Sequence, residues 1–116
     1  PVICAGALSS IKYLRSEHGV ELRKQHQNRA KRLKKILRHK NINMIENETH
    51  IVPVLVGDPI RCKQISDTLL NEHNIYVQPI NYPTVPEGTE RLRFAPTPMH
   101  TNAMISDLAE RLEEVL

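Results

Sequence analysis

Two arginines stand two residues apart in the run Arg-Leu-Arg-Phe at 91–94. Residues two apart on a strand point to the same face, so Arg91 and Arg93 are expected on one side of the chain. A guanidinium held on a strand is a planar fork that binds a carboxylate through two hydrogen bonds, which suits recognition of an amino acid or a dicarboxylate. A surface ion pair is the alternative. We take Arg93 as the candidate for carboxylate binding.

A proline-rich segment precedes and follows this run. Its prolines lie between Pro79 and Pro98, with asparagine, threonine and glycine among them. Proline restricts the backbone, which predicts a rigid loop instead of a flexible linker. Residues 85–88 (Val-Pro-Glu-Gly) have proline second and glycine fourth, the preference of a type I turn. We expect a loop of defined shape beside the candidate arginine.

A second candidate for binding is the basic run between Arg23 and Lys40, which holds nine lysines or arginines and no acid. On a helix, such a run can contact the phosphates of DNA or RNA. The run has no interleaved aromatic residues and the net charge of the chain is only +3. These features favour a solvated helix face. A basic patch near a phosphorylated substrate is a third interpretation.

Histidines and cysteines form no pattern typical of a metal site or a nucleophile. The six histidines have no HxxxH or HxH spacing, and Cys4 and Cys62 form no CxxC motif. Both cysteines stand among apolar neighbours on expected helices, where cysteine behaves as a small hydrophobic residue. We therefore expect no metal site and two structural cysteines in a reducing compartment.

Apolar residues spaced three and four apart predict four helices. Their expected ranges are 2–15, 20–38, 60–73 and 101–115. Gly19 interrupts the pattern between the first two. Asp58 and Pro59 are an expected N-cap and first position of the third helix, and Thr101 is the expected N-cap of the fourth.

Three short strands are expected between these helices, at 50–56, 74–78 and 92–95. Pro53 cannot donate a ladder hydrogen bond, so the first strand is expected at a sheet edge or a bulge. The order helix, helix, strand, helix, strand, loop, strand, helix predicts an α+β fold in one domain of 116 residues. We expect helices covering a short, mostly antiparallel sheet.

Composition restricts the class of protein. The chain is 40% apolar and 25% charged, with no tryptophan and one phenylalanine, which predicts a folded chain with an aliphatic core. The start mixes apolar positions with Lys12, Arg15 and Glu17, which is unlike a signal peptide. No apolar run approaches the roughly 18 residues of a membrane span. Because the chain opens with Pro1, we expect it to start inside a longer protein.

Three motifs cover the loop and its flanking strands: NIYVQ at 74–78, INYPTVP at 80–86 and RLRFAPTP at 91–98. Together they resemble the C-terminal signature of the 5-aminolevulinate synthases, a branch of the α-oxoamine synthase family of pyridoxal-phosphate (PLP) enzymes. Weaker similarity at 5–8 (AGAL), 25–28 (QHQN) and 50–54 (HIVPV) extends the resemblance over the whole chain. The INY and APTP segments favour this branch over related synthases that share a comparable loop and arginine.

The resemblance implies the small C-terminal domain of a fold-type I PLP enzyme. Residues 1–39 are then a helical segment leading in from an absent cofactor domain, 50–116 an αβ sandwich, and 76–93 the active-site lid. The family is an acyltransferase that condenses glycine with succinyl-CoA to 5-aminolevulinate, CoA and CO2, the first step of haem and tetrapyrrole synthesis. It works as a homodimer, without nucleic acid or membrane partners. Closing and reopening of such a lid can limit turnover.

Site residues follow from the same resemblance, position by position. Arg93 matches the arginine that holds the glycine carboxylate, and Thr84 matches the threonine near the succinyl carboxylate. The lid residues are Tyr76, Asn81, Tyr82, Pro83 and Gly88. Two positions depart from the family pattern, because Glu87 replaces a usual basic residue and Met99 a common histidine.

The resemblance also implies what this chain lacks. The family's Schiff-base lysine stands in a glycine-rich segment, and no lysine from Lys12 to Lys63 has that setting. A PLP enzyme needs that lysine, so we expect no catalytic and no cofactor-binding residue here, and an inactive isolated chain. The expected compartment is bacterial cytoplasm, or the mitochondrial matrix in a eukaryote. The alternatives are a synthase with a different acyl-CoA and a stand-alone basic module that binds nucleic acid.

Overall fold

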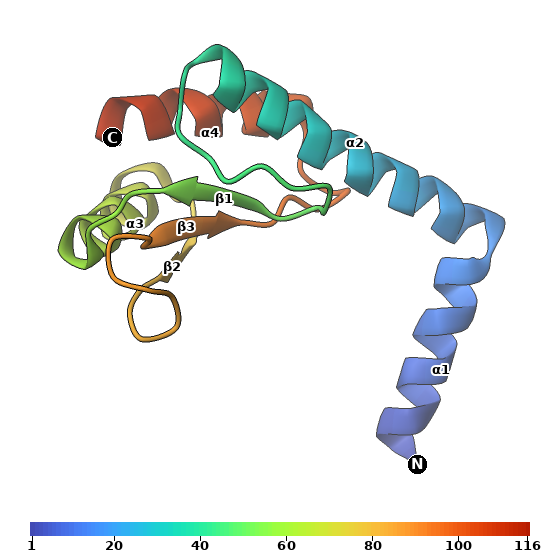
Figure 1. The fold of residues 1–116 in the computed structure, drawn as a ribbon. Helices are drawn as coiled ribbons and strands as arrows, with labels where there is room; N and C mark the ends of the chain where they lie inside the picture. The colour runs from blue at the N-terminus through green and yellow to red at the C-terminus, as the bar shows by residue number, and fades with distance from the viewer.

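Seven helices and strands follow one another in the predicted order. The structure, a computed structural model, describes all residues from 1 to 116. Its elements are α1 (Val2–Arg15), α2 (Glu17–His39), β1 (Val52–Leu55), α3 (Pro59–His73), β2 (Gln78–Ile80), β3 (Arg91–Phe94) and α4 (Asn102–Val115) (Figure 1). None of the four helices is both long and apolar enough to cross a bilayer.

The three strands form one antiparallel sheet in the order β1-β3-β2. Leu92 of the central strand lies opposite Val54 of β1 and Pro79 of β2. Pro53 lies on an edge strand, as its missing N–H predicted. Two backbone hydrogen bonds of 2.9 Å join residues 43–45 to the outer edge of that strand. The predicted α+β class with an antiparallel sheet is confirmed.

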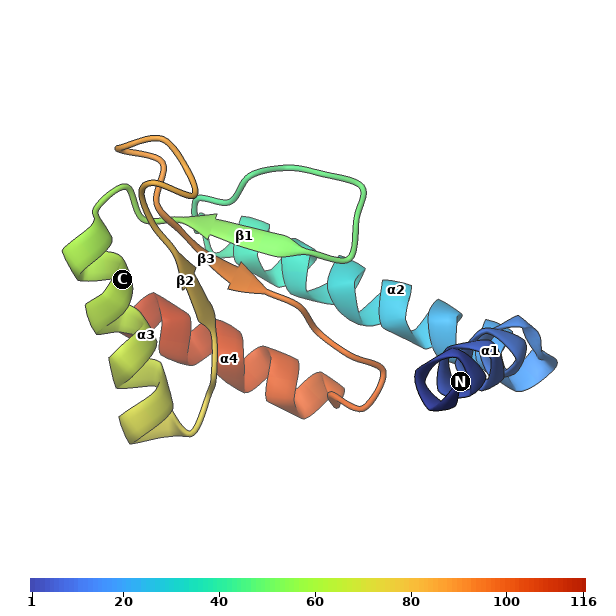
Figure 2. The same ribbon diagram turned by 90° about the horizontal axis from the view of Figure 1, so that it is seen from below.

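Helices cover only one face of the sheet. α2 and α4 lie side by side on that face, α3 lies beside β2, and no helix covers the opposite face (Figures 1 and 2). Buried apolar side chains fill the space between the layers, and the largest are Leu33, Leu37, Leu69, Leu92 and Leu112. Full burial of one such side chain contributes about 1.5 to 3 kcal/mol. The aliphatic core predicted from composition is therefore what joins helices to sheet.

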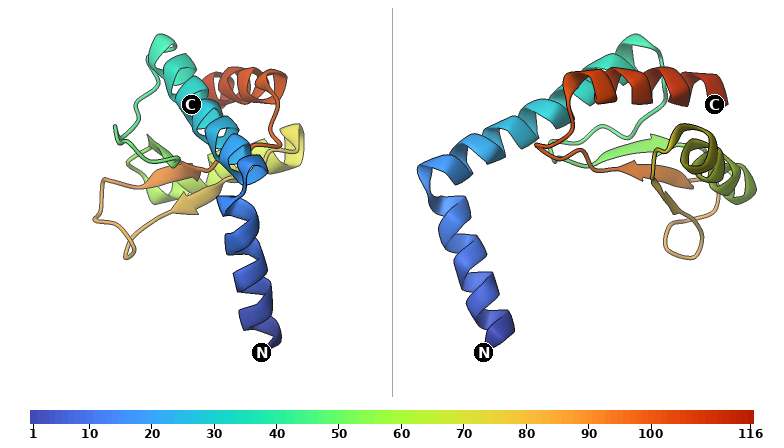
Figure 3. Two further views of the ribbon diagram at one scale, coloured as in Figure 1. Left: turned by 90° about the vertical axis from the view of Figure 1, so that its right-hand side faces the viewer. Right: turned by 180° about the vertical axis from the view of Figure 1, so that it is seen from behind.

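The first helix extends away from this body and contacts only α2 (Figure 3). None of its residues is buried, and Val2 and Ile3 are 85% and 88% exposed. The helix predicted at 2–15 is confirmed, but its apolar face packs against nothing within this chain. Cys4 is exposed on it, so the expectation of a structural cysteine there is wrong, whereas Cys62 is buried as expected.

The corner between α1 and α2 differs from the prediction. The helix breaks at Ser16, which has an extended backbone and whose hydroxyl accepts a hydrogen bond from the Gly19 N–H at 3.2 Å. α2 therefore begins at Glu17 and not at residue 20. Gly19 lies inside α2, where a Cβ would collide with the backbone of Tyr13 and the following residue. Glycine is needed for close packing at this corner, and not to interrupt a helix.

The second strand also begins later than predicted, at Gln78 instead of residue 74. Asn74 has a left-handed backbone (φ 56°) that ends α3. The chain then turns back along α3, where the Ile75 N–H donates to Leu69 O at 2.9 Å and the Ser66 hydroxyl donates to Val77 O at 2.9 Å. Contacts with α3 therefore replace sheet pairing over residues 75–77.

The turn in the proline-rich loop is shifted by one residue from the predicted 85–88. The Thr89 N–H donates to Pro86 O at 3.1 Å, which places Gly88 third in the turn with φ +80°. A positive φ at the third position is the requirement of a type II turn, so the type I prediction is wrong. The third strand is shifted likewise, to Arg91–Phe94.

Two predicted helix caps are confirmed. Asp58 Oδ1 accepts a hydrogen bond from the Arg61 N–H at 2.7 Å with Pro59 in the first turn of α3, and Thr101 Oγ1 accepts from the Met104 N–H at 3.2 Å. These side chains satisfy amide groups that have no partner inside the helix.

We expect Asp58→Ala to lower the free energy of unfolding of the 116-residue chain by about 1 kcal/mol, because it removes the N-cap acceptor of α3. Urea denaturation followed by circular dichroism measures this loss. Asp58→Asn is the matched control, since its amide oxygen still accepts from Arg61 N–H. Equal losses in both variants would show that the cap contributes nothing.

The two thiols are expected to differ in reactivity. Burial raises the pKa of the Cys62 thiol, and the backbone N–H of Ile80 offsets this only in part. Because a raised pKa leaves less thiolate, Cys62 should resist DTNB at mildly alkaline pH until the chain is unfolded, while exposed Cys4 reacts at once. Cys4→Ser should abolish the fast reaction. Equal rates for both thiols in the folded chain would refute this assignment.

Candidate functional site

Arg93 lies on the central strand of the sheet, on the face that no helix covers. Its strand neighbours Leu92 and Phe94 are buried in the core, so alternation sends Arg93 to the opposite side. Its side chain is exposed, and its guanidinium makes no hydrogen bond or ion pair within the chain. The backbone of Arg93 is held on both sides by neighbouring strands, which places the start of this exposed cationic side chain on the uncovered face.

The second arginine of the motif has a different environment. Arg91 is half-buried, and its Nε donates to Thr89 O at 2.9 Å. That hydrogen bond holds the guanidinium against the end of the proline-rich loop. Sequence alternation placed both arginines on one face, and Arg93 was the predicted carboxylate ligand. Arg91 thus has one partner within the chain, whereas the guanidinium of Arg93 has none.

A groove of about 860 Å³ adjoins Arg93. It opens where the chains of β2 and β3 separate beyond Gln78 and Arg93, the last paired residues. Its apolar lining comes from core residues and from α4, which contributes Met104, Ile105 and Leu108, so the groove extends to the helix-covered side of the sheet. Its polar lining residues are His73, Asn74, Tyr76, Gln78, Arg93, His100 and Asp107. A concave, mainly apolar site with a few polar groups is the usual form of a ligand site.

One predicted lid residue shares this groove. Tyr76 is 70% exposed, and its hydroxyl donates to Gln78 Oε1 at 2.7 Å. Gln78 lies directly opposite Arg93 in the β2-β3 pair. Gln78 was not among the predicted site residues. Its side-chain direction follows from alternation, but only the pairing register reveals that it neighbours Arg93.

The other predicted site residues lie outside the groove. Thr84 is exposed in the loop of residues 81–90, and this loop leaves the sheet where Ile80 pairs with Arg91, two residues along the strand from Arg93. Its remaining predicted members are Asn81, Tyr82, Pro83 and Gly88. Within the predicted lid range 76–93, residues 78–80 and 91–93 belong to strands. The parts of the predicted lid range that lie outside strands are residues 76–77 and 81–90.

Both ends of this loop are anchored. Asn81 Nδ2 donates to Pro59 O at 3.3 Å, and Glu90 O accepts hydrogen bonds from the Val56 and Gly57 N–H groups, both at 2.9 Å. Glu90 is only 1% exposed, and its Oε2 has no hydrogen-bond partner. Burial of Glu90 was not predicted, because the charged and polar residues around it in the sequence do not indicate a buried position. The loop thus has fixed ends and an exposed centre.

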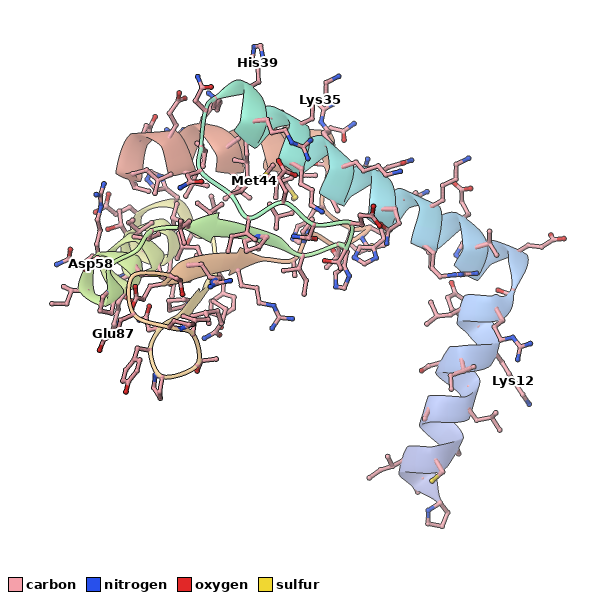
Figure 4. All side chains as sticks on the ribbon, in the orientation of Figure 1. Lys12, Lys35, His39, Met44, Asp58 and Glu87 are labelled. Atoms are coloured by element: carbon pink, nitrogen blue, oxygen red, sulfur yellow. The ribbon has the colours of Figure 1, made fainter.

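The centre of the loop carries one of the two departures from the family pattern. Glu87 is exposed at the turn, at the same end of the molecule as Asp58 (Figure 4). The loop therefore presents negative charge beside the N-cap of α3. Neither acid lines the groove that holds Arg93.

The basic run on α2 is partly used inside the fold. Arg29 donates from Nε to His100 O at 2.7 Å, and Arg38 and Lys40 pair with Glu46 and Glu113. These partners raise the pKa of Arg38 and of Lys40. The remaining exposed cations include Lys35, which points away from the sheet beside His39 (Figure 4). Their position matches a solvated helix face.

Two histidines far apart in sequence meet in the fold. The rings of His26 on α2 and His50 before β1 have centroids 4.8 Å apart. No group of three or more histidine, cysteine, aspartate or glutamate side chains is placed to hold a metal ion. The pair therefore lacks the third ligand of a typical metal site.

The lysines of this chain do not fit a PLP site. Lys34 is the buried lysine, 6% exposed, and its Nζ lies 2.6 to 3.2 Å from Asn47 O, Asn47 Oδ1 and Thr49 O. A charged amine held by three oxygens is not a free nucleophile. Every other lysine is exposed or half-buried on a helix surface. Lys34 is thus the one buried lysine, and its Nζ has three oxygen partners.

Comparison with known proteins agrees with the resemblance. The family model described as aminotransferase class I and II matches residues 1–112. The chain is 51% identical over 113 residues to 5-aminolevulinate synthase 1 of Cereibacter sphaeroides, covering 97% of the chain and 27% of that protein. It is 53% identical over 115 residues to 5-aminolevulinate synthase of Rhizobium meliloti, covering 99% and 28%. The chain thus spans about a quarter of the length of these relatives.

Solved structures confirm the predicted fold type. A serine palmitoyltransferase from S. paucimobilis that carries PLP and myriocin superposes with a TM-score of 0.80 at 26% identity, over 92% of this chain and 27% of that one. An 8-amino-7-oxononanoate synthase from Francisella tularensis has a TM-score of 0.77 at 20% identity, over 93% and 30%, which shows the fold alone.

These matches confirm the predicted similarity to the C-terminal region of 5-aminolevulinate synthases and to the α-oxoamine synthase fold. The family model covers nearly the whole chain. This chain belongs to the aminotransferase class I and II family.

Proposed function

We propose that this chain is the C-terminal domain of a 5-aminolevulinate synthase, a PLP-dependent acyltransferase that condenses glycine with succinyl-CoA to 5-aminolevulinate, CoA and CO2. The observation that carries the proposal is the free guanidinium of Arg93, fixed on the uncovered sheet face. Identities near 50% with named 5-aminolevulinate synthases support the substrate assignment. The absence of any hydrogen bond or ion pair from the Arg93 side chain within this chain supports its role in binding a substrate carboxylate.

Arg93 is suited to hold the glycine carboxylate. Two parallel N–H···O bonds from one guanidinium fix a carboxylate in position and in plane. Covering the groove with the rest of the enzyme would desolvate this charge, and a desolvated cation needs an anionic partner. The substrate carboxylate supplies that partner. The bound carboxylate therefore offsets the cost of removing water from the Arg93 guanidinium.

The loop of residues 81–90 is the part of the chain that can close over bound substrate. Its ends are anchored through Asn81 and Glu90, while Tyr82 is 62% exposed. Thr84, exposed near the middle, would then contact the succinyl carboxylate through its hydroxyl. The chain's own contribution to catalysis is thus to orient one substrate and to exclude water.

The rest of the proposed active site is supplied by parts of the enzyme beyond residues 1–116. PLP, when bound by the whole enzyme, supplies the electron sink for the reaction. The exposed apolar face of α1 is where we place the contact with the cofactor domain, as expected for a segment leading in from it. The whole enzyme is proposed as a homodimer in the bacterial cytoplasm, the compartment expected from the sequence.

The alternative functions have less support. A synthase with a different acyl-CoA would be expected to resemble serine palmitoyltransferase or 8-amino-7-oxononanoate synthase most, yet those chains are 26% and 20% identical. A nucleic-acid-binding module would use the basic run as one surface, whereas four of its nine members, Arg29, Lys34, Arg38 and Lys40, have partners inside the fold. No specific observation favours either one.

We expect Arg93→Leu in the full-length enzyme to raise the KM for glycine about 30-fold or more, the effect of removing one partner from a desolvated charge pair. Steady-state kinetics with each substrate varied in turn measures this, and the KM for succinyl-CoA should change much less. Arg93→Lys keeps the positive charge but loses the two parallel N–H donors, so its KM for glycine should lie between those of the wild type and Arg93→Leu. Arg32→Leu, which removes an exposed arginine on α2, is the control. Glycine kinetics unchanged by Arg93→Leu would refute the proposal that Arg93 binds the glycine carboxylate.

The isolated 116-residue chain is expected to neither retain PLP nor form 5-aminolevulinate, because its buried lysine is held by three oxygens. Incubation with PLP, borohydride reduction and peptide mapping measures covalent attachment, with the full-length enzyme as the positive control. Stoichiometric labelling of a single lysine in the isolated chain would contradict this expectation.

A further inference from the structure

One hydrogen-bonding side chain lies directly across the sheet from Arg93. The pairing register places Arg93 between Pro53 on β1 and Gln78 on β2. Side chains of directly opposite residues start about 4.5 to 5.5 Å apart at their Cβ atoms and share one face of the sheet. Proline has no side-chain donor or acceptor, so Gln78 is the polar neighbour of Arg93 across the ladder.

The carboxamide of Gln78 is held in a defined orientation. Its Oε1 accepts a hydrogen bond from the Tyr76 hydroxyl at 2.7 Å, and its Nε2 donates to Pro79 O at 3.2 Å. An amide nitrogen carries two N–H donors, and only one of them has a partner here. The second N–H has no partner within the chain, and Gln78 lies directly opposite Arg93 on the same face of the sheet.

We propose that Gln78 is a second binding residue for the substrate carboxylate, donating this free N–H to the carboxylate that Arg93 holds, and that Tyr76 is the residue that positions it. The inference rests on the proposed function and extends it by naming two residues. A carboxylate has about four acceptor sites, and a guanidinium fork fills two. In a groove closed to water, the remaining sites need further donors. Gln78 is placed to be one.

The neutral carboxamide is also the suitable group at this position. A carboxylate on the same side-chain framework would lie directly opposite Arg93 and form a cross-strand ion pair with it. That internal anion would compete with the substrate for the fork. Glutamine adds a donor without occupying the guanidinium, whereas glutamate removes the donor and blocks the arginine. The two residues differ by little in shape, which makes the exchange a sensitive test.

The test compares Gln78→Glu with Gln64→Glu in the full-length enzyme. Gln64 is exposed on α3 and has no hydrogen bond within the chain, so its variant makes the same charge change away from Arg93. We expect Gln78→Glu to raise the KM for glycine at least about tenfold, the scale of one lost hydrogen bond to a charged group. The KM for succinyl-CoA should stay within about twofold, and Gln64→Glu should resemble wild type. The glycine dissociation constant, from the change in cofactor absorbance on adding glycine alone, should shift in parallel.

The Tyr76→Phe variant tests whether the Tyr76 hydroxyl positions Gln78 or only stabilises the fold. It removes only the hydroxyl that holds Gln78 Oε1, so it should raise the KM for glycine by a few-fold and leave the thermal unfolding midpoint unchanged. Gln78→Leu in combination with Tyr76→Phe should be no worse than Gln78→Leu alone, because the hydroxyl acts through the amide. Independent, additive losses would overturn the assignment of Tyr76.

The outcomes also separate this inference from the proposed function. If wild-type enzyme makes 5-aminolevulinate and Arg93→Leu impairs glycine use, but Gln78→Glu matches Gln64→Glu, then Gln78 has no role and only this inference fails. If the wild-type enzyme does not condense glycine with succinyl-CoA at all, the proposed function fails first. Glycine binding weakened in Gln78→Leu as well as in Gln78→Glu, and unchanged in Gln64→Glu, supports both, because the leucine variant removes the donor without placing an anion opposite Arg93. Normal glycine binding in Gln78→Leu would overturn the donor role of Gln78.

Discussion

The pairing of β3 with a strand on each side is the constraint on which the candidate site depends. Leu92 and Phe94 must be buried under α2 and α4 to complete the core, and alternation then sends Arg91 and Arg93 to the uncovered face. A slip of one residue in register would reverse both faces at once and bury two charges. Core packing therefore holds the cationic fork in place, although the fork contributes nothing to the core.

The same strand pairing separates two regions that are held by different contacts. Near Arg93 the chain is held by strand pairing, and residues 75–77 are held by backbone and hydroxyl contacts with α3. Beyond Ile80 the loop departs with anchored ends, and its central residues are exposed. Arg93 is thus held by strand pairing on both sides of its backbone, whereas the loop is held at its two ends.

The basic run between Arg23 and Lys40 shows that residues of one charge in one sequence pattern can have different roles in the fold. Nine basic residues in one run look alike in the sequence, but the fold divides them. Lys34 is buried and holds the segment before β1 through Asn47 and Thr49, while Arg29 joins α2 to the residues before α4. Several members of the run thus stabilise the domain, which weakens the argument for a nucleic-acid interface.

The sequence alone determined the order and type of all seven elements, both tested helix caps and the edge position of β1, because periodicity, caps and proline act over a few neighbouring residues. It also determined the family, since the motifs around Arg93 are local. Tertiary structure decided the rest. It set the start of β2 through contacts with α3, left Cys4 exposed and Cys62 buried, and held Arg91 while leaving Arg93 free. Each of these depends on which distant residues become neighbours, and a pattern within one segment carries no information about the segment that packs against it.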